Sequence, residues 1–330
     1  MKNYFRLMMG MLMISMFVFT ACSKDDDDDN TNPPEENKNF ETLKTYLIAN
    51  DMDLPKILDS WITTAENVYT VMTDNDPAND YYIIDIRSAS DFGAGHIDKS
   101  HNAALKDVLD TAAKSNNMPI IVVCYTGQAA SHAVVALRLS GYKNAKVMKW
   151  GMSGWNSNND SWTANVSSIG VGNANWQAAP GDIAVNTNYG DPVLNTTATD
   201  GAGILKEQVK KMLDAGFQGI AATSVLDNPK EYFINNFWAE SDVQHYGHIK
   251  TAHRILPLSL KNGEYKFYDP SRTAVTYCWT GQTSSMVTAY MNVLGYKAKS
   301  LKFGTNGMIH SKLQSHKWDA SLAKNYPLVQ

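Results

Sequence analysis

Cysteine is scarce in this chain of 330 residues, which contains only Cys22, Cys124 and Cys278. None of them belongs to a Cys-X-X-Cys pair, and this absence disfavours a thioredoxin-like redox role. The chain also lacks a His/Cys group with metal-ligand spacing, so the sequence implies no metal and no other cofactor. Cys124 and Cys278 occupy equivalent places in two repeats, and a disulfide would need the repeats to face each other there. We therefore predict two free thiols.

A strong excess of charge of one sign is also missing. The formal net charge is −4, and the run Asp25–Asp29 alone supplies five negative charges. The rest of the chain is therefore close to neutral. This balance gives no support to nucleic-acid binding or to a strongly basic membrane face.

The N-terminus carries an apolar run that is too short for a comfortable transmembrane helix, which needs about 20 apolar residues. Lys2 and Arg6 precede the run Leu7–Ala21, which ends at Cys22. This pattern predicts a signal peptide. Residues 19–22, Phe-Thr-Ala-Cys, resemble the bacterial lipoprotein box. The resemblance implies lipidation of Cys22, and simple secretion is the alternative.

A polar segment follows the predicted signal peptide of residues 1–22. It contains the aspartate run and two prolines, and it has too little apolar surface to offset the cost of ordering. Residues 23–39 are therefore predicted to be a flexible tether. The aspartate run resembles the acidic tether of Bacteroidetes-type lipoproteins, which implies a lipid-anchored protein of the cell envelope, displayed on the outer membrane. A solvated spacer is the alternative.

The body of the chain contains two diverged copies of one unit. Three stretches match in the same order, pairing residues 124–131 with 278–285, 141–143 with 295–297, and 95–97 with 247–249. The repeat is far longer than a solenoid unit, so it indicates two domains. We predict them over residues 40–156 and 200–330, joined by a polar linker over 157–199. Part of this long linker, around Trp176, is expected to pack along one domain.

Each unit alternates strand and helix patterns. In the first, Tyr81–Ile86 and the wholly apolar Ile120–Val123 predict strands, and Ala130–Leu139 has helical spacing that stops at Gly141. The second unit repeats this order with residues 274–277, 284–294 and Gly295. This alternation predicts an α/β fold in which each domain has a central, mainly parallel sheet flanked by helices. Ligands of such sheets bind at the carboxyl ends of strands, where both cysteines fall.

Each cysteine directly follows a predicted buried strand and precedes a tight loop and a helix. The main-chain N–H groups at such a helix start have no partner within the helix, so they form a cradle for an anion. A thiol in this cradle is expected to ionise more readily than a free thiol, whose pKa is about 8.5. Gly127 and Gly281 lie where the backbone must turn without a Cβ. The alternative is that Cys124 and Cys278 are only small buried residues.

The first unit resembles the rhodanese family of sulfurtransferases, and the second resembles a more diverged member. The segments that carry the resemblance are Tyr81–Arg87, Asp91–Ile97, Ser100–Asn102, the Cys124 loop and Gly141–Gly151. The resemblance implies a cysteine that takes a sulfane sulfur from an anionic donor, holds it as a persulfide and passes it to a thiophilic acceptor. Such donors are thiosulfate, mercaptopyruvate and polysulfide, and the acceptor is a thiol.

The catalytic residues implied by this resemblance are Cys124 and Cys278, which we rank equally. The persulfide would be held by the loops that follow them, namely Tyr125, Thr126, Gly127, Gln128, Ala129 and Ala130 in the first unit and Trp279, Thr280, Gly281, Gln282, Thr283 and Ser284 in the second. Active members of the thiosulfate type commonly have arginine as the sixth loop residue, where this chain has Ala129 and Thr283. An anionic donor would therefore lack its usual guanidinium partner.

Four residues of the first unit are expected to support the loop rather than to react. Asp85 and Arg87 are predicted to form an ion pair or loop anchor, and His96 and His101 to order the segment after the second strand. The second unit has Asn-Asn-Phe-Trp at residues 235–238, where the first has Ile-Asp-Ile-Arg, and so it has lost the predicted pair.

Two other kinds of protein are alternatives to a sulfurtransferase. A cysteine phosphatase or arsenate reductase uses a similar cradle but requires arginine six residues after the cysteine, where Ala130 and Ser284 stand here. A surface module that keeps the scaffold and binds a ligand or partner without catalysis is the stronger alternative. The missing arginines and the diverged second unit favour it.

Overall fold

The computed structural model describes residues 35–330 except Pro180, with side chains from Lys38 onward. The predicted signal peptide, Cys22 and most of the predicted tether lie outside the described residues. The first described element is helix α1 (Glu35–Ala49), so the predicted tether was wrong for residues 35–39. Phe40, Leu43 and Leu47 recur at helical spacing and are fully buried. Their burial stabilises a helix that continues back into the polar residues before them.

The first half of the body is built on a five-stranded, wholly parallel sheet with the order β1-β5-β4-β2-β3. Its strands are β1 (Ile62–Thr63), β2 (Tyr82–Asp85), β3 (His101–Asn102), β4 (Ile120–Val123) and β5 (Lys146–Met148). Its helices are α2 (Leu54–Ile57), α3 (Ala65–Thr73), α4 (Ala89–Ala94), α5 (Val108–Ala112), α6 (Gln128–Leu139) and α7 (Met152–Trp155). All four residues of β4 are buried, as expected for a central parallel strand covered on both faces.

The second half repeats this plan with a parallel sheet of order β7-β11-β10-β8. Its strands are β7 (Gly219–Ile220), β8 (Phe233–Asn236), β10 (Ala274–Tyr277) and β11 (Ala298–Leu301), and its helices are α8 (Gly201–Asp214), α9 (Ala222–Asp227), α10 (Glu240–Tyr246) and α11 (Gln282–Val293). The order matches β1-β5-β4-β2 strand for strand. The predicted α/β class, with parallel sheets flanked by helices, is confirmed.

The segment between the halves packs along the second half. Strand β6 (Trp176–Gln177) pairs antiparallel with β9 (His248–Ile249), and Ala184 bridges His253 at the edge of the sheet. The expectation that the region around Trp176 packs against a domain is confirmed. Short 3-10 helices complete the secondary structure: Leu105–Asp107, Ser157–Asn159, Thr163–Asn165, Pro229–Glu231, Glu264–Phe267, Gly304–Gly307, His310–Lys312 and Ala320–Leu322.

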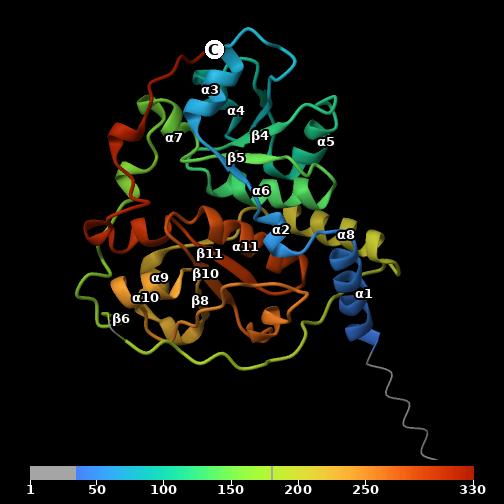
Figure 1. The fold of residues 1–330 in the computed structure, drawn as a ribbon, viewed down its shortest axis with the longest axis vertical. Helices are drawn as coiled ribbons and strands as arrows, with labels where there is room; N and C mark the ends of the chain where they lie inside the picture. The colour runs from blue at the N-terminus through green and yellow to red at the C-terminus, as the bar shows by residue number, and fades with distance from the viewer. Residues whose placement is uncertain (1–34, 180) are drawn as a thin grey trace, which may run out of the picture. The chain divides into compact units, whose positions relative to one another are not determined.

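The two halves meet chiefly through α6 and α11, which lie side by side between the two sheets (Figure 1). Each end of the described chain packs against the opposite half. Helix α1 packs against α8 of the second half, and the C-terminal residues contact the first half. There Val329 pairs with His96, and the indole N–H of Trp155 donates to the Pro327 oxygen, 2.9 Å away. Within residues 35–330, none of the helices has the length and apolar character needed to cross a membrane.

Candidate active site

The two cysteines lie at the carboxyl ends of the central strands, as predicted. Cys124 follows β4, and Cys278 follows β10. In each loop a glycine then takes a left-handed conformation, with φ +84° at Gly127 and +76° at Gly281, and directly precedes the helix. The strand, loop and helix therefore bring each sulfur to the N-terminal end of a 12-residue helix.

The sulfur of Cys124 lies in a main-chain cradle. It accepts hydrogen bonds from the N–H groups of Gly127 at 3.1 Å and Ala130 at 3.4 Å. The cysteine is only 3% exposed. Burial raises the pKa of the Cys124 thiol, and the amides of Ala130, Thr126, Gly127 and Ala129 offset this only in part. The expectation that the cradle makes this thiol ionise more readily is therefore wrong for Cys124, because desolvation outweighs the amide donors.

The sulfur of Cys278 has a different set of neighbours. It accepts from the N–H of Ser284 at 3.3 Å and lies 3.5 Å from the hydroxyl oxygen of the same residue. Ser284 is itself bonded to the Ser300 hydroxyl at 2.8 Å. This cysteine is 2% exposed. Both thiols are free, which confirms the prediction for these two residues.

The two cysteine loops contact each other through their glutamines. The side-chain amide of Gln282 donates to the main-chain oxygen of Thr126 at 3.2 Å, and the N–H of Phe303 donates to the Gln128 side-chain oxygen at 2.7 Å. Sequence reasoning placed both glutamines in a persulfide-binding loop. Their side chains point across the junction between the halves, where both are buried.

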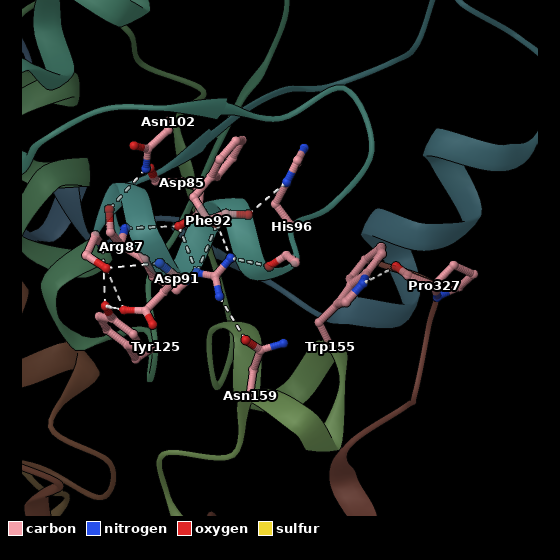
Figure 2. Close-up of polar contacts among 12 residues, drawn as sticks. Asp85, Arg87, Asp91, Phe92, His96, Asn102, Tyr125, Trp155, Asn159 and Pro327 are labelled. Carbon is pink, nitrogen blue, oxygen red and sulfur yellow. Dashed lines mark hydrogen bonds and ion pairs between the residues drawn. The ribbon is translucent and has the colours of Figure 1, made fainter. Parts of the chain in front are cut away.

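The residue after each cysteine is aromatic and is held in place from outside the loop. Tyr125 is 37% exposed, and its hydroxyl donates to Asp91 and accepts from the N–H of Ser88 at 3.2 Å (Figure 2). Hydrogen bonds from Ser88 and Tyr125 lower the pKa of Asp91. Trp279 lies in an aromatic cluster, with ring centroids 4.4 Å from Trp238, 5.4 Å from Tyr246 and 5.2 Å from His316.

The remaining loop residues are two threonines, which bond to the loop glutamines, and the uncharged Ala129 and Thr283. The Thr126 hydroxyl accepts from the Gln128 side chain, and the Thr280 hydroxyl donates to the Gln282 side chain. Ala129 and Thr283, at the sixth position of each loop, are half-buried. Neither carries a charge, so the first turns of α6 and α11 hold no guanidinium near the sulfurs.

Asp85 and Arg87 form a fully buried ion pair with a shortest separation of 2.7 Å. Arg87 also donates to the side-chain oxygen of Asn159 and to the main-chain oxygen of Gly95, both at 2.8 Å (Figure 2). The predicted loop anchor is thus present, and it joins β2 to the end of α4 and to the segment after α7. In the second half, Asn236 and Trp238 stand at the corresponding places, and both are buried.

The candidate histidines make structural contacts. His96 stacks on Phe92 at 3.8 Å and bonds the Phe92 oxygen through Nδ1 at 2.9 Å. His101 stacks on Tyr82 at 4.2 Å. Neither histidine is brought to a cysteine by a hydrogen bond among the described residues.

Sequence reasoning missed Ser300, and it missed Trp162 and Trp318 of the aromatic cluster between the loops. Ser300 lies on β11, outside the stretches that match between the repeats, so the sequence contained no signal for it. Trp150, Trp162, Phe303 and Trp318 gather from both halves and the linker into one cluster. The indole N–H of Trp162 donates to the Thr126 oxygen at 3.2 Å. Residues 35–330, apart from Pro180, contain no group of three or more His, Cys, Asp or Glu side chains placed to hold a metal.

Comparison with known proteins agrees with this geometry in the first half. Residues 64–158 match the rhodanese-like domain family, so this part of the chain is a rhodanese-like domain. Thiosulfate sulfurtransferase GlpE of Shewanella oneidensis is 29% identical over 83 residues, which are 25% of this chain and 82% of that protein.

Two solved structures are similar as well. Thiosulfate sulfurtransferase from Pseudomonas aeruginosa is 12% identical, with 86% of this chain and 49% of that chain covered and a TM-score of 0.31. A rhodanese-like domain protein from Staphylococcus aureus is 19% identical, with 28% of this chain and 87% of that chain covered and a TM-score of 0.24.

Proposed function

We propose that the chain is a tandem rhodanese-like sulfurtransferase that carries a sulfane sulfur on a cysteine as a persulfide. The donor is a small sulfur anion, such as thiosulfate, mercaptopyruvate or polysulfide, and the acceptor is a thiol or another thiophile. The rhodanese-like domain at residues 64–158 and the likeness to a protein named as a thiosulfate sulfurtransferase support this class. The repeated cysteine loop of the second half supports a second unit of the same kind.

With thiosulfate as donor, the proposed reaction has two steps. The cysteine thiolate attacks the outer sulfur, a new S–S bond forms, and sulfite leaves with the electron pair of the broken S–S bond. A thiophilic acceptor then attacks the outer sulfur of the persulfide and restores the thiolate. Splitting the transfer in this way is covalent nucleophilic catalysis.

The observation that carries the proposal is the pair of N–H groups aimed at the Cys124 sulfur, from Gly127 at 3.1 Å and Ala130 at 3.4 Å. These donors are fixed by the start of α6, so they need no reorganisation when negative charge develops on sulfur. A preorganised donor of this kind contributes roughly 3 kcal/mol to a transition state.

The burial of both sulfurs favours one alternative, a module that keeps the scaffold and binds a ligand or partner without catalysis. Cys124 and Cys278 are 3% and 2% exposed, and burial raises the pKa of the Cys124 thiol. A donor must therefore displace residues that cover the sulfurs. The two readings differ in whether any donor leaves sulfur on the protein.

The test is to incubate the chain without its first 22 residues separately with thiosulfate, 3-mercaptopyruvate and polysulfide. Intact mass spectrometry should show an addition of one sulfur atom, which cyanide then removes. Cys124→Ala and Cys278→Ala assign the sulfur to one loop or the other. If no donor loads either cysteine, the transferase proposal is lost and the binding module is favoured.

For location, we propose that lipid on Cys22 anchors the protein in the cell envelope, with the body displayed from the outer membrane. The support is the N-terminal sequence alone, because Cys22 lies outside the described residues. Cys22→Ala should move the full-length protein from the membrane fraction to the soluble fraction of expressing cells. Equal membrane content of the variant and the parent would contradict the anchor.

A further inference from the structure

The groups around the Cys124 sulfur (the first pocket) and those around the Cys278 sulfur (the second pocket) differ in one feature. Only the second pocket contains a chain of hydroxyl groups. Ser284 and Ala130 are equivalent, since their N–H groups donate to the sulfurs of Cys278 and Cys124 at 3.3 and 3.4 Å. Ser300 and Val147 are also equivalent by sheet register. Ser300 pairs with Thr276 of β10, while Val147 pairs with Val122 of β4. Two hydroxyls of the second pocket are therefore replaced by apolar groups in the first.

The hydroxyls of the second pocket form a continuous, fully buried network. Ser284 lies 3.5 Å from the Cys278 sulfur and 2.8 Å from the Ser300 hydroxyl. The Ser285 hydroxyl lies 3.2 Å from Ser300 and 2.5 Å from the Gly281 oxygen, and Ser300 lies 3.3 Å from that same oxygen. Ser284, Ser285 and Ser300 are all 0% exposed.

This network has two proton arrangements. When the sulfur is a thiol, its S–H donates to Ser284, Ser284 donates to Ser300, and Ser300 donates to the Gly281 oxygen. When the sulfur is an anion, Ser284 turns its O–H to the sulfur, Ser300 donates to Ser284, and Ser285 can donate to Ser300. No hydroxyl gains or loses a proton in this change, and the thiol proton leaves to water. The network thus adds one donor to the sulfur only when the sulfur carries charge.

The first pocket has no such response. Cys124, Ala130 and Val147 belong to one apolar cluster, and the hydroxyl of Ser131 is bonded to the Gly127 oxygen at 2.7 Å rather than to the sulfur. An anion at Cys124 is therefore supported by main-chain N–H groups alone.

We propose that Ser284, backed by Ser300, is a positioning residue that makes Cys278 the sulfur-carrying cysteine of the pair. The inference rests on the proposed function for its role in sulfur transfer. Its physical content, a hydroxyl donor to the Cys278 anion, is independent of any sulfur donor. The inference favours Cys278 over Cys124 as the sulfur carrier, whereas the likeness to the rhodanese family is stronger in the first half, which contains Cys124.

The test measures iodoacetamide alkylation of each cysteine by peptide mass spectrometry in the folded chain without its first 22 residues. In the parent, Cys278 should react faster than Cys124 at neutral pH. Ser284→Ala installs the first half's own residue and should slow Cys278 about tenfold, which corresponds to a loss of about 1.4 kcal/mol of stabilisation of the sulfur anion. In Ser284→Ala, the pH dependence of the Cys278 alkylation rate should also move to higher pH. If the substitution only loosened the packing around Cys278, this cysteine would instead be alkylated faster at every pH.

Two further variants separate this role from general packing. Thr288→Val removes a fully buried hydroxyl one turn further along α11 and should leave the alkylation of Cys278 unchanged. Ala130→Ser supplies the missing hydroxyl to the first pocket and should speed the alkylation of Cys124. Circular dichroism and urea midpoints confirm that each variant is folded.

The inference is overturned if Ser284→Ala and Thr288→Val leave Cys278 equally reactive, or if Cys124 reacts faster than Cys278 in the parent. Loading with thiosulfate or polysulfide is measured separately. If no donor loads sulfur but Ser284→Ala still slows the alkylation of Cys278, the proposed function is contradicted. The role of Ser284 as a hydrogen-bond donor to the Cys278 sulfur is then still supported.

Discussion

Gln282 of the second cysteine loop donates its side-chain amide to the main-chain oxygen of Thr126 in the first loop, 3.2 Å away. The reciprocal contact runs from the N–H of Phe303 to Gln128, at 2.7 Å. Each glutamine directly follows its loop glycine and begins its helix. The conformation of each cysteine loop is therefore fixed partly by the opposite half, and the two halves form one unit at the place where sulfur would be held.

Removing either glutamine side chain should destabilise the body. Gln128→Ala leaves the N–H of Phe303 without its partner, and Gln282→Ala removes a donor to Thr126. Each should lower the free energy of unfolding by about 1–2 kcal/mol, measured by urea titration. Gln314→Ala, at an exposed position, serves as the control and should change it by less than about 0.5 kcal/mol. Variants of Gln128 and Gln282 as stable as this control would show that the contacts do not hold the halves together.

A side chain at Gly151 should disrupt the first loop. This glycine has φ +60°, and a Cβ there would lie 2.3 Å from the Cys124 oxygen and 2.6 Å from the Gly127 nitrogen. Gly151→Ala should therefore cost roughly 3 kcal/mol of stability. Gly172→Ala is the matched control, because Gly172 has φ +76° but open space around its missing Cβ. Urea titration of the two variants compares them, and equal losses would mean that only the backbone conformation matters.

Acid should weaken the junction between the halves through His132. This residue lies on α6, is fully buried and meets Phe217 edge-on at 6.1 Å. Burial lowers its pKa from 6.5 to about 4, and the Met212 main chain offsets this only in part. The neutral ring is favoured in the folded state, so its contribution is fully present above pH 6.5 and is lost as pH falls towards 4.

The shift corresponds to about 3 kcal/mol at most. Urea titrations between pH 7 and pH 4 should show a steeper loss of stability in the parent than in His132→Leu, which cannot be protonated. Parallel pH profiles for the two proteins would contradict this assignment.

The sequence predicted the central strands closely because their signal is local. Residues 120–123 and 274–277 are strands as predicted, and both cysteines lie at their carboxyl ends. The helices α6 and α11 begin two residues earlier than the predicted starts at Ala130 and Ser284. Gln128 and Gln282 break the apolar pattern, yet they are buried because their partners come from the other half. A tertiary contact of this kind leaves no trace in hydrophobic periodicity.

The chemistry of the site was harder to predict than its place. The competition between amide donors and desolvation at Cys124 depends on how deeply the sulfur is buried, which the loop sequence does not state. The contact of Ser300 with Ser284 depends on strand register, since Ser300 is paired with Thr276 on the neighbouring strand. The helix over residues 35–49 was not predicted, because its burial is against α8, far along the chain.

The central claim is that sulfur resides on a cysteine of these loops between donor and acceptor. The most direct measurement is to load the folded chain with thiosulfate or polysulfide, digest it under conditions that preserve persulfides, and identify the modified peptide. The account predicts one extra sulfur on the peptide that contains Cys278 in the parent. It predicts no extra sulfur on the corresponding peptide of Cys278→Ala. An unmodified pair of cysteine peptides after every donor would contradict it.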